Sequence, residues 1–261
     1  MHVSVIMPAH NAARYIGDAL TSLLRQRDAA QLDIIVIDDG STDGTAAIVT
    51  EFAIGAPEVR LVGVSHGGIA KARNRGIAEL APNAELVTML DADDLSPAGR
   101  FARDIEAFAS DPELDFLYGQ ARMFYETGDD PLIPIAPYHD FRGVQLGASL
   151  MRLDLLRRLG PFDESLKIGE DTDMLFRLFD LRPRMKLIDL PCVYYRRHDA
   201  NITRDSAAVL ETLQRVVMAR LRRKRAGAEV APLPAGFFDG MEAIKPADWL
   251  RKPQVAGVPE Q

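Results

Sequence analysis

The feature that most constrains the fold is a regular alternation between short apolar runs and segments with helical spacing of apolar residues, over about residues 3 to 110. Strand-like runs occupy residues 3–7, 34–37, 59–64 and 86–90, and helices are expected at 16–26, from 45 onwards, at 69–80 and at 97–109. Nearly continuous apolar strands that alternate with helices form parallel sheets covered on both faces. The sequence therefore predicts an α/β fold with a mostly parallel, Rossmann-like sheet flanked by helices.

Beyond residue 110 the pattern is less regular. It indicates a strand at 116–118, an irregular proline-containing stretch at 126–141, helices at 149–159 and 171–179, a strand at 185–188 and a long helix at 206–225. We expect one domain over residues 1–204, divided at about residue 110, and a C-terminal helix at 205–226. The proline-scattered residues 227–261 are expected to be loosely packed or disordered.

Carboxylates follow two of the predicted strands. Asp38 and Asp39 come after the second run, and Asp91, Asp93 and Asp94 come after the fourth. Because the carboxyl ends of parallel strands meet at one edge of a sheet, we expect the two groups to lie near each other. Adjacent carboxylates repel one another unless water or a cation screens them. Two interpretations are open: a divalent-metal site, or a solvated loop whose last acids cap the next helix.

Composition and charge exclude several classes of protein. A chain of 261 residues with 47% hydrophobic content can form one sizeable domain, and its net charge of −7 argues against a general nucleic-acid binder. Cys192 is the single cysteine, which excludes an internal disulfide and a multi-cysteine metal site. Neither a signal peptide nor an apolar stretch near the roughly 20 residues that span a bilayer can be recognised. We therefore expect a soluble, cytoplasmic protein.

The common phosphate-binding motifs are absent. The chain has neither a P-loop nor a Gly-x-Gly-x-x-Gly turn. A divalent cation on the carboxylates can hold a phosphate instead, and it lets an acidic protein accept an anionic substrate. Lys71, Arg73 and Arg75 open the helix before the fourth strand and offer more positive charge. The alternative for these three residues is a solvated helix face.

Several segments resemble glycosyltransferase family 2, an inverting family with the GT-A fold. Leu90-Asp91-Ala92-Asp93-Asp94 is similar to the metal-binding Asp-x-Asp segment of that family. The other segments, at 3–11, 35–45, 67–76, 160–171 and 195–203, follow the order of the family and extend the match over about residues 3 to 204. The resemblance implies a nucleotide-sugar-binding half at 1–110 and an acceptor and catalytic half at 111–204.

The resemblance implies a nucleotide site at the ends of the first two strands. Asp39 would accept the N3–H of a uracil ring, with Pro8, His10 and Asn11 beside it. His10 stands where many relatives carry a tyrosine stacked on the base, and its alternative is a structural histidine. Arg73 is implied near the base or the diphosphate, in preference to Lys71.

The resemblance also implies a metal site. Asp93 would ligate Mn²⁺ or Mg²⁺ directly, and Asp91 would face the ribose or a metal-bound water. His198 would complete the metal or diphosphate site, unless it is a surface histidine. Asp94 is expected to cap the next helix. The metal would stabilise the nucleoside diphosphate as it leaves.

Asp171 is implied as the catalytic base that takes the proton of the acceptor hydroxyl. Glu170, next to it, would position the acceptor or bond the loop. The alternative is that both acids only interact with the dipole of a helix N-terminus. Residues 120–151 would hold the acceptor surface, where Tyr125, Tyr138 and His139 either contact a sugar or serve packing. The basic run at 220–225 is either a solvated helix end or a contact with anionic lipid.

These features together predict a metal-dependent inverting glycosyltransferase. A UDP-sugar is the favoured donor, and the acceptor would be a hydroxyl of a glycan, a glycolipid or another cell-surface precursor, with peripheral membrane contact considered. One alternative is a haloacid dehalogenase-type phosphatase, which normally has its Asp-x-Asp on the first strand. A second is a sugar-nucleotide pyrophosphorylase, which would want a glycine-rich loop at 8–11. A third is an inactive nucleotide-sugar-binding module. The presence of all four expected acids argues against it: Asp39, Asp91, Asp93 and Asp171.

Overall fold

One half of the central sheet is parallel. The computed structural model describes residues 1–199, 201, 206–227, 229–237 and 239. Its eight-stranded sheet has the order β3-β2-β1-β4-β7-β5-β6, with β8 paired to β5. Strands β1 (His2–Ala9), β2 (Gln31–Asp39), β3 (Val59–Val64) and β4 (Leu86–Met89) run parallel, which confirms the predicted alternation. All eight residues of β1 are buried, as a central strand covered on both faces requires.

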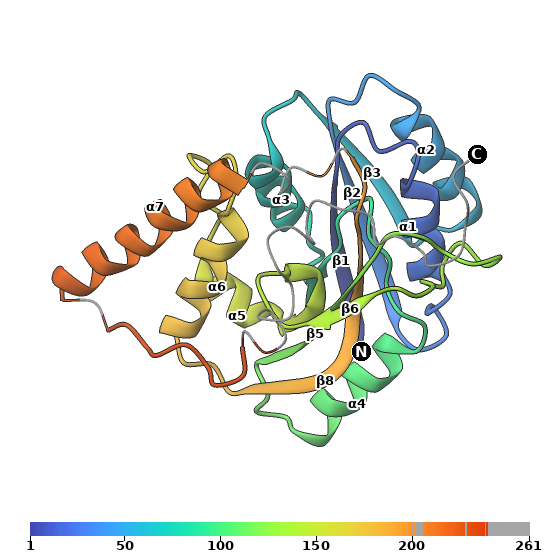
Figure 1. Cartoon of the computed structure of the whole chain (residues 1–261). Coiled ribbons are helices and arrows are strands. Elements are labelled where there is room, and N and C mark those ends of the chain that lie inside the picture. The colour runs from blue at the N-terminus through green and yellow to red at the C-terminus, as the bar shows by residue number, and fades with distance from the viewer. Residues whose placement is uncertain (200, 202–205, 228, 238, 240–261) are drawn as a thin grey trace.

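Helices cover both faces of this half (Figure 1). Helices α1 (Ile16–Leu24), α2 (Thr45–Gly55) and α4 (Arg100–Ser110) lie on one face, and α3 (Ile69–Ala78) lies on the other. Helix α1 buries Ile16, Ala19, Leu20 and Leu23, which the helical spacing places on one side. The predicted helices therefore form at the expected positions.

The second half of the sheet is built from antiparallel and crossing strands. It contains β5 (Phe116–Phe124), β6 (His139–Phe141), β7 (Ser149–Arg152) and β8 (Met185–Arg196), with a 3₁₀ turn, η1, at Leu146–Ala148. Strand β7 pairs antiparallel with both β4 and β5, and β8 runs parallel to β5. Helices α5 (Leu153–Leu159) and α6 (Glu170–Asp180) pack on the face that carries α3.

The helix predicted at 149–159 is wrong over its first turn. Residues 149–152 form β7, and only the remainder is helical, as α5. The reason is tertiary: Leu150 and Met151 are fully buried where β7 fills the gap between β4 and β5. Sheet pairing overrides local helical spacing there. The predicted strands at 116–118 and 185–188 are correct but much shorter than the observed β5 and β8.

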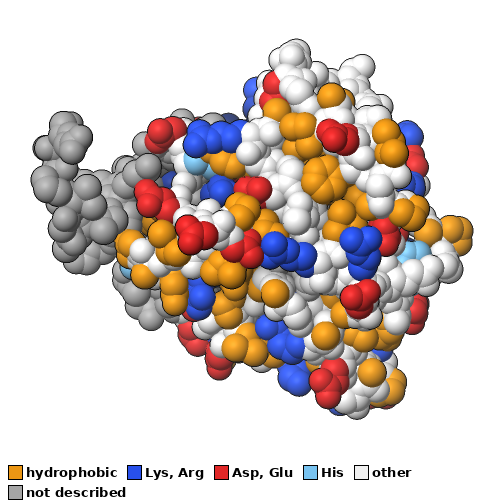
Figure 2. Space-filling view, turned by 90° about the vertical axis from the view of Figure 1, so that its right-hand side faces the viewer, with side chains coloured by type: hydrophobic (Ala, Val, Ile, Leu, Met, Phe, Trp, Pro, Cys, Tyr) orange, Lys and Arg blue, Asp and Glu red, His pale blue; other side chains and the backbone are white. Residues whose placement is uncertain are grey.

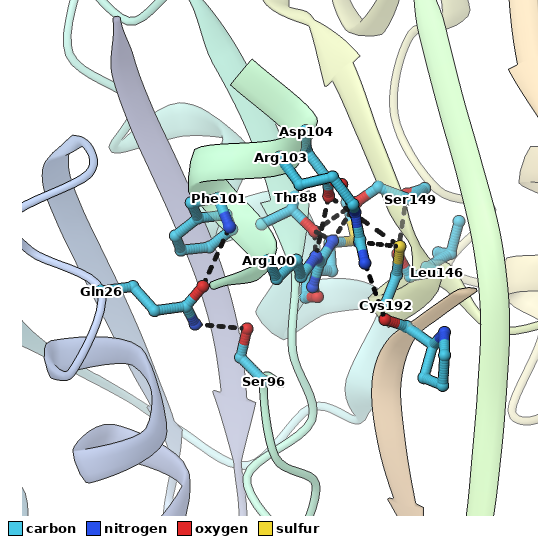
Figure 3. A network of polar contacts seen from close by, with 12 residues as sticks. Gln26, Thr88, Ser96, Arg100, Phe101, Arg103, Asp104, Leu146, Ser149 and Cys192 are labelled. Atoms are coloured by element: carbon cyan, nitrogen blue, oxygen red, sulfur yellow. Dashed lines mark hydrogen bonds and ion pairs between the residues drawn. The ribbon is translucent and has the colours of Figure 1, made fainter. Parts of the chain in front are cut away.

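A buried polar network holds β4 against the second half (Figure 3). Arg100 of α4 is fully buried and donates from NH2 to the carbonyl oxygen of Ser149 at 2.7 Å and to Thr88 Oγ1 at 3.1 Å, while its Nε contacts Asp104 at 3.2 Å. Cys192 of β8 receives a contact from Arg103 at 2.9 Å, and burial raises the pKa of its thiol to about 11. The cysteine is therefore a buried structural residue between β5 and α4.

The C-terminal helix forms as predicted, but part of the predicted tail is packed. Helix α7 spans Ser206–Arg225. Phe237 is 1% exposed, and its ring lies 5.3 Å from that of Tyr118 and 4.8 Å from that of Phe179. The prediction of loose packing is therefore wrong at Phe237, because its ring is buried in the core. Residues 240–261 lie outside the described residues. None of the described helices has the length and hydropathy needed to cross a bilayer.

Candidate active site

The carboxyl ends of β1, β2 and β4 form one edge, and the candidate residues gather there. Strand β1 lies between β2 and β4, so Asp39 and Asp91 follow strands two interstrand spacings apart, roughly 9–10 Å. Asn11 connects the loops: its N–H donates to Ser41 Oγ at 2.9 Å and its Oδ1 accepts the N–H of Thr42 at 2.8 Å. The edge can therefore carry a nucleotide lengthwise, base at one end and diphosphate at the other.

Asp39 sits at the end proposed for the base. Its carboxylate is buried and accepts the N–H groups of Gly67 and Gly68 at 2.7 and 2.8 Å. The His10 Nδ1–H donates to the Asp39 carbonyl at 2.8 Å, and His66 Nδ1 lies 3.0 Å from an Asp39 carboxylate oxygen. The two imidazole rings stack with centroids 4.2 Å apart. Asp39 thus also fixes the turn before α3, a structural role in addition to the predicted one.

His66 is a neighbour of this site that the sequence reasoning missed. The ring is exposed, contacts Asp39 and stacks on the ring of His10. Among the described residues, these three form one group whose ligand atoms all lie within 4.8 Å of one another. Both Asp39 oxygens already accept backbone amides, and the group lies away from the Asp-x-Asp loop. The signal for His66 was its position immediately before Gly67-Gly68. Pro8, the remaining predicted residue here, is buried in β1 opposite Ile37.

Asp93 meets His198 across more than a hundred residues of sequence. His198 Nε2 lies 2.9 Å from Asp93 Oδ2, and Asn201 Nδ2 lies 3.4 Å from the same oxygen. The Tyr15 ring stacks on the His198 ring with centroids 4.6 Å apart and an interplanar angle of 23°. Arg196 donates to the Asp93 carbonyl at 3.0 Å. The segment after β8 therefore closes on the Asp-x-Asp loop.

The role predicted for Asp94 is wrong. Helix α4 begins at Arg100 with Gly99 at the N-cap position and no capping side chain. Asp94 is buried, and its Oδ1 accepts the N–H of Arg196 at 2.9 Å. Burial, with the charges of Asp93 and Asp91, holds the pKa of Asp94 well above its usual range. Asp94 anchors β8 to the loop because its buried carboxylate is occupied by the backbone of Arg196 and not by the next helix.

Asp93 and His198 lie close enough to share one divalent cation, whereas Asp91 is paired with Arg73 and does not join them in a three-ligand group within the described residues. The side chains of Asp91 and Asp93 are 37% and 28% exposed, and that of His198 is 14% exposed, so all three can reach a ligand from solvent. Two carboxylates and one imidazole suit Mn²⁺ and are compatible with Mg²⁺. The close contact between Asp93 and His198 brings two of the predicted ligands to one point.

Arg73 links the two halves of the molecule. Its side chain is 4% exposed; NH2 contacts Asp91 Oδ1 at 2.8 Å, and NH1 bonds Glu170. Burial opposes the charge of the guanidinium, but Asp91 and Glu170 outweigh it and raise the pKa of Arg73. Lys71 and Arg75 are exposed, as the alternative reading of a solvated helix face expects. A contact between Arg73 and the nucleotide stays a prediction.

Glu170 and Asp171 open α6, as the sequence predicted. Glu170 is buried in its pair with Arg73, and a contact with an acceptor stays a prediction. Asp171 is half-buried above Met174 and Leu175, which are fully buried on the same side of α6. Burial, and then the charge of Glu170, raises the pKa of Asp171 to about 7, although Arg73 opposes the shift. Such a carboxylate is suited to accept a proton near neutral pH.

The predicted acceptor surface is only partly ordered into sheet. Tyr138 is 40% exposed, and the Arg122 guanidinium lies 3.9 Å from its ring centroid. Tyr125 and His139 are half-buried. Asn74 holds the neighbouring segment, since it donates to the Phe162 carbonyl at 3.0 Å and accepts the Phe162 N–H at 2.8 Å. Sugar contacts of the three aromatic residues stay predictions.

Comparison with known proteins decides the family. Residues 4–156, more than half of the chain, match the family model for Glycosyl transferase family 2. The chain belongs to glycosyltransferase family 2. The phosphatase and pyrophosphorylase hypotheses are left without support. This family-2 chain is 26% identical over 242 residues to EpsJ of Bacillus subtilis (strain 168), described as an uncharacterized glycosyltransferase. It is 32% identical over 208 residues to the succinoglycan biosynthesis protein ExoU of Rhizobium meliloti (strain 1021).

The family-2 chain spans only part of these relatives. The matches cover 84% and 71% of the chain but 68% of EpsJ and 59% of ExoU. Staphylococcus aureus TarS is similar in structure, with a TM-score of 0.61 and 21% identity over 85% of this chain and 40% of TarS. The mannosyltransferase PcManGT of Pyrobaculum calidifontis gives a TM-score of 0.60 and 22% identity over 95% of this chain and 69% of its own. These likenesses confirm the GT-A fold.

Proposed function

We propose that the chain transfers a sugar, with inversion, from a nucleotide-diphospho-sugar to a hydroxyl group. The observation that carries this proposal is the run of contacts from Glu170 through Arg73 to Asp91, with Asp171 directly after Glu170 at the start of α6. It ties a carboxyl group with a pKa of about 7 to the Asp-x-Asp loop at the nucleotide edge. An inactive binding module has no need of a carboxylate with such a raised pKa.

Asp171 acts as the base. An acceptor hydroxyl attacks poorly unless its proton is removed as the new bond forms. Asp171 takes this proton while the hydroxyl oxygen bonds the anomeric carbon and the bond from that carbon to the diphosphate oxygen breaks. The shared electron pair leaves with the nucleoside diphosphate. A single displacement with the base opposite the leaving group inverts the anomeric carbon.

Asp93, His198 and Asp91 would hold the divalent cation. When bound, the cation supplies Lewis-acid stabilisation of the leaving diphosphate. Arg73 orients Asp91, and Arg196 and Asn201 fix the loop around Asp93. An imidazole donor favours Mn²⁺ over Mg²⁺, so Mn²⁺ is the proposed ion. PcManGT, solved with GDP-Man and Mn²⁺, supports this choice.

A UDP-sugar is the proposed donor. Asp39 offers a buried carboxylate at the base end, which suits the single N3–H donor of uracil. TarS has been solved with UDP and with UDP-GlcNAc, which supports a uridine nucleotide. The acceptor proposed is a hydroxyl of a glycan or of a lipid-linked sugar, in line with the role of ExoU in succinoglycan biosynthesis.

Calorimetry tests the donor and metal assignments. UDP should bind in Mn²⁺ and lose at least about tenfold in affinity in EDTA or in the Asp93→Asn variant, since each removes the link between loop and diphosphate. The matched control is Asp28→Asn, an exposed acid remote from the edge. GDP, dTDP and CMP complete the series. Equal UDP affinity with and without Mn²⁺, or tighter binding of another nucleotide, would contradict the assignment.

A further inference from the structure

Helix α7 has an exposed apolar row that neither the fold nor the proposed reaction uses. The structure describes ten exposed large hydrophobic side chains, and four of them, Leu213, Val217, Met218 and Leu221, lie within nine residues of α7. Leu213, Val217 and Leu221 are spaced four residues apart and therefore share one side of the helix. They are 43%, 38% and 43% exposed.

The row borders a side of α7 that packs against the domain. Val216 is 1% exposed, and Arg220 contacts Asp180 of α6 at 2.6 Å. A methyl group on Gly169 would lie only 2.5 Å from Thr212 Cγ2, so α7 packs tightly on the residue before α6. Figure 1 shows α7 projecting from the body beside α6. Its apolar row therefore points away from the domain.

Basic residues surround the end of the row. Lys224 continues the row three residues after Leu221, and Arg222, Lys224 and Arg225 are all exposed. Glu211 is the one acid in the sequence of α7, and it pairs with Arg215 at 2.5 Å. The face shown in Figure 2, on the other side of the molecule from α7, instead mixes acidic and basic side chains. Positive charge is thus concentrated on α7 in a chain whose net charge is −7.

We propose that this face of α7 binds the surface of an anionic lipid bilayer. Apolar side chains beside long basic side chains suit the boundary between acyl chains and headgroups, where the cations reach anionic phosphates. A second copy of the chain fits less well. A twofold contact through α7 would bring two helices together that carry six basic residues and one acid each.

The position of α7 gives this contact a consequence for the reaction, which rests on the proposed function. Gly169, against which α7 packs, directly precedes Glu170 and the proposed base Asp171. Docking through α7 would hold the acceptor side of the molecule at the membrane surface. A lipid-linked sugar would then reach the base from the bilayer.

Vesicle co-sedimentation tests the proposal with the full chain. Vesicles of equal parts phosphatidylcholine and phosphatidylglycerol should bind the protein, and pure phosphatidylcholine vesicles should bind it at least about tenfold more weakly. Replacing Leu213, Val217 and Leu221 together by Gln should reduce binding to the anionic vesicles by about tenfold. The control is Ile54→Gln with Leu190→Gln, which removes exposed apolar side chains outside both α7 and the predicted acceptor surface. If the triple variant lost no more vesicle binding than the control variant, the proposal would be overturned.

A charge variant keeps the test decisive if the Gln variant folds poorly. Lys224→Glu with Arg225→Glu should abolish binding to anionic vesicles, and Arg157→Glu with Arg158→Glu, on exposed positions of α5, should not. UDP affinity in solution, measured on the same samples, should stay unchanged. If every α7 variant still binds both the anionic vesicles and UDP, the membrane proposal is wrong and the proposed function is unaffected. If α7 variants dissociate a dimer and vesicle binding is unaffected, the row is an interface between copies.

Discussion

At the scale of single residues, Asp171 is the position where stability and the proposed catalytic role oppose each other. The pKa of Asp171 is about 7, above the ordinary 3.8. Between these two pH values the native state therefore keeps a proton on Asp171 that the unfolded chain has lost. Its contribution to stability is complete below about pH 4 and is lost as the pH rises towards 7. Above that pH the protein holds a half-buried charge next to Glu170 that destabilises it, and that charge is the one the proposed base requires.

Asp171→Asn should therefore stabilise the protein in a pH-dependent way. The gain in the free energy of unfolding should be absent near pH 4 and reach about 1 to 4 kcal/mol at about pH 8. Urea denaturation at both pH values measures it. The control is Asp163→Asn, because hydrogen bonds from Ser165 lower the pKa of Asp163 and its removal should bring no gain at high pH. A stability gain that did not grow with pH would contradict the burial of a charge at Asp171.

Tyr15 is a residue-scale feature that no sequence motif pointed to. Its ring is stacked on His198, and the Arg196 guanidinium lies 5.2 Å from the Tyr15 centroid. The stack fixes the orientation of an imidazole that the proposed metal site needs. Tyr15 is thus a positioning residue.

Tyr15→Leu should weaken Mn²⁺ binding by about three- to tenfold, which corresponds to the loss of one ring stack. Tyr15→Phe keeps the ring and should bind Mn²⁺ as the unaltered protein does. Electron paramagnetic resonance titration of free Mn²⁺ in the presence of UDP measures the affinity without relying on turnover. Equal losses in the Leu and Phe variants would show that the ring itself does not matter.

At the scale of elements, helix α3 joins the two halves through Arg73. Its guanidinium bonds Asp91 after β4 and Glu170 at the start of α6, and both Arg73 and Glu170 are buried. A buried ion pair contributes little by itself, but removal of one partner leaves an uncompensated charge. Replacing only one of the two partners is therefore expected to lower the free energy of unfolding.

Arg73→Met should lower the free energy of unfolding by about 3–5 kcal/mol. Adding Glu170→Met should restore part of this loss, because the orphaned carboxylate is then removed. Arg75→Met is the matched control on the same helix; Arg75 is half exposed, pairs with Glu79, and should cost less than about 1 kcal/mol. Urea denaturation of the unaltered protein, both single variants at positions 73 and 170, the double variant and the control measures these differences. Similar losses at positions 73 and 75 would mean that Arg73 is not the link.

The elements also show how far the sequence could be interpreted. Strands β1 to β4 and helices α1 to α4 were predictable because each carries a complete pattern of its own, apolar throughout or apolar at helical spacing. Strand β7 was not, because Leu150 and Met151 are buried by β4 and β5, which are distant in sequence. The cap predicted at Asp94 failed for the same reason, since its partner is Arg196, 102 residues away.

At the scale of the whole molecule, the fold brings together residues that only the family resemblance could connect. Asp93 with His198 and Arg73 with Glu170 are separated by 105 and 97 residues, so no local pattern relates them. His66 and Tyr15 were missed because single aromatic or imidazole side chains carry no pattern. The two halves thus form one site at the edge where β1, β2 and β4 end.

The central claim, inverting transfer with Asp171 as base, is tested most directly by the anomeric form of the released sugar. With water as acceptor, UDP-α-glucose or UDP-α-GlcNAc is incubated with the protein and Mn²⁺, and proton NMR is recorded before mutarotation. The account predicts that the β-anomer appears first, and that Asp171→Asn, which still binds UDP, releases sugar at least about a hundredfold more slowly. Initial release of the α-anomer, or undiminished release by Asp171→Asn, would contradict it.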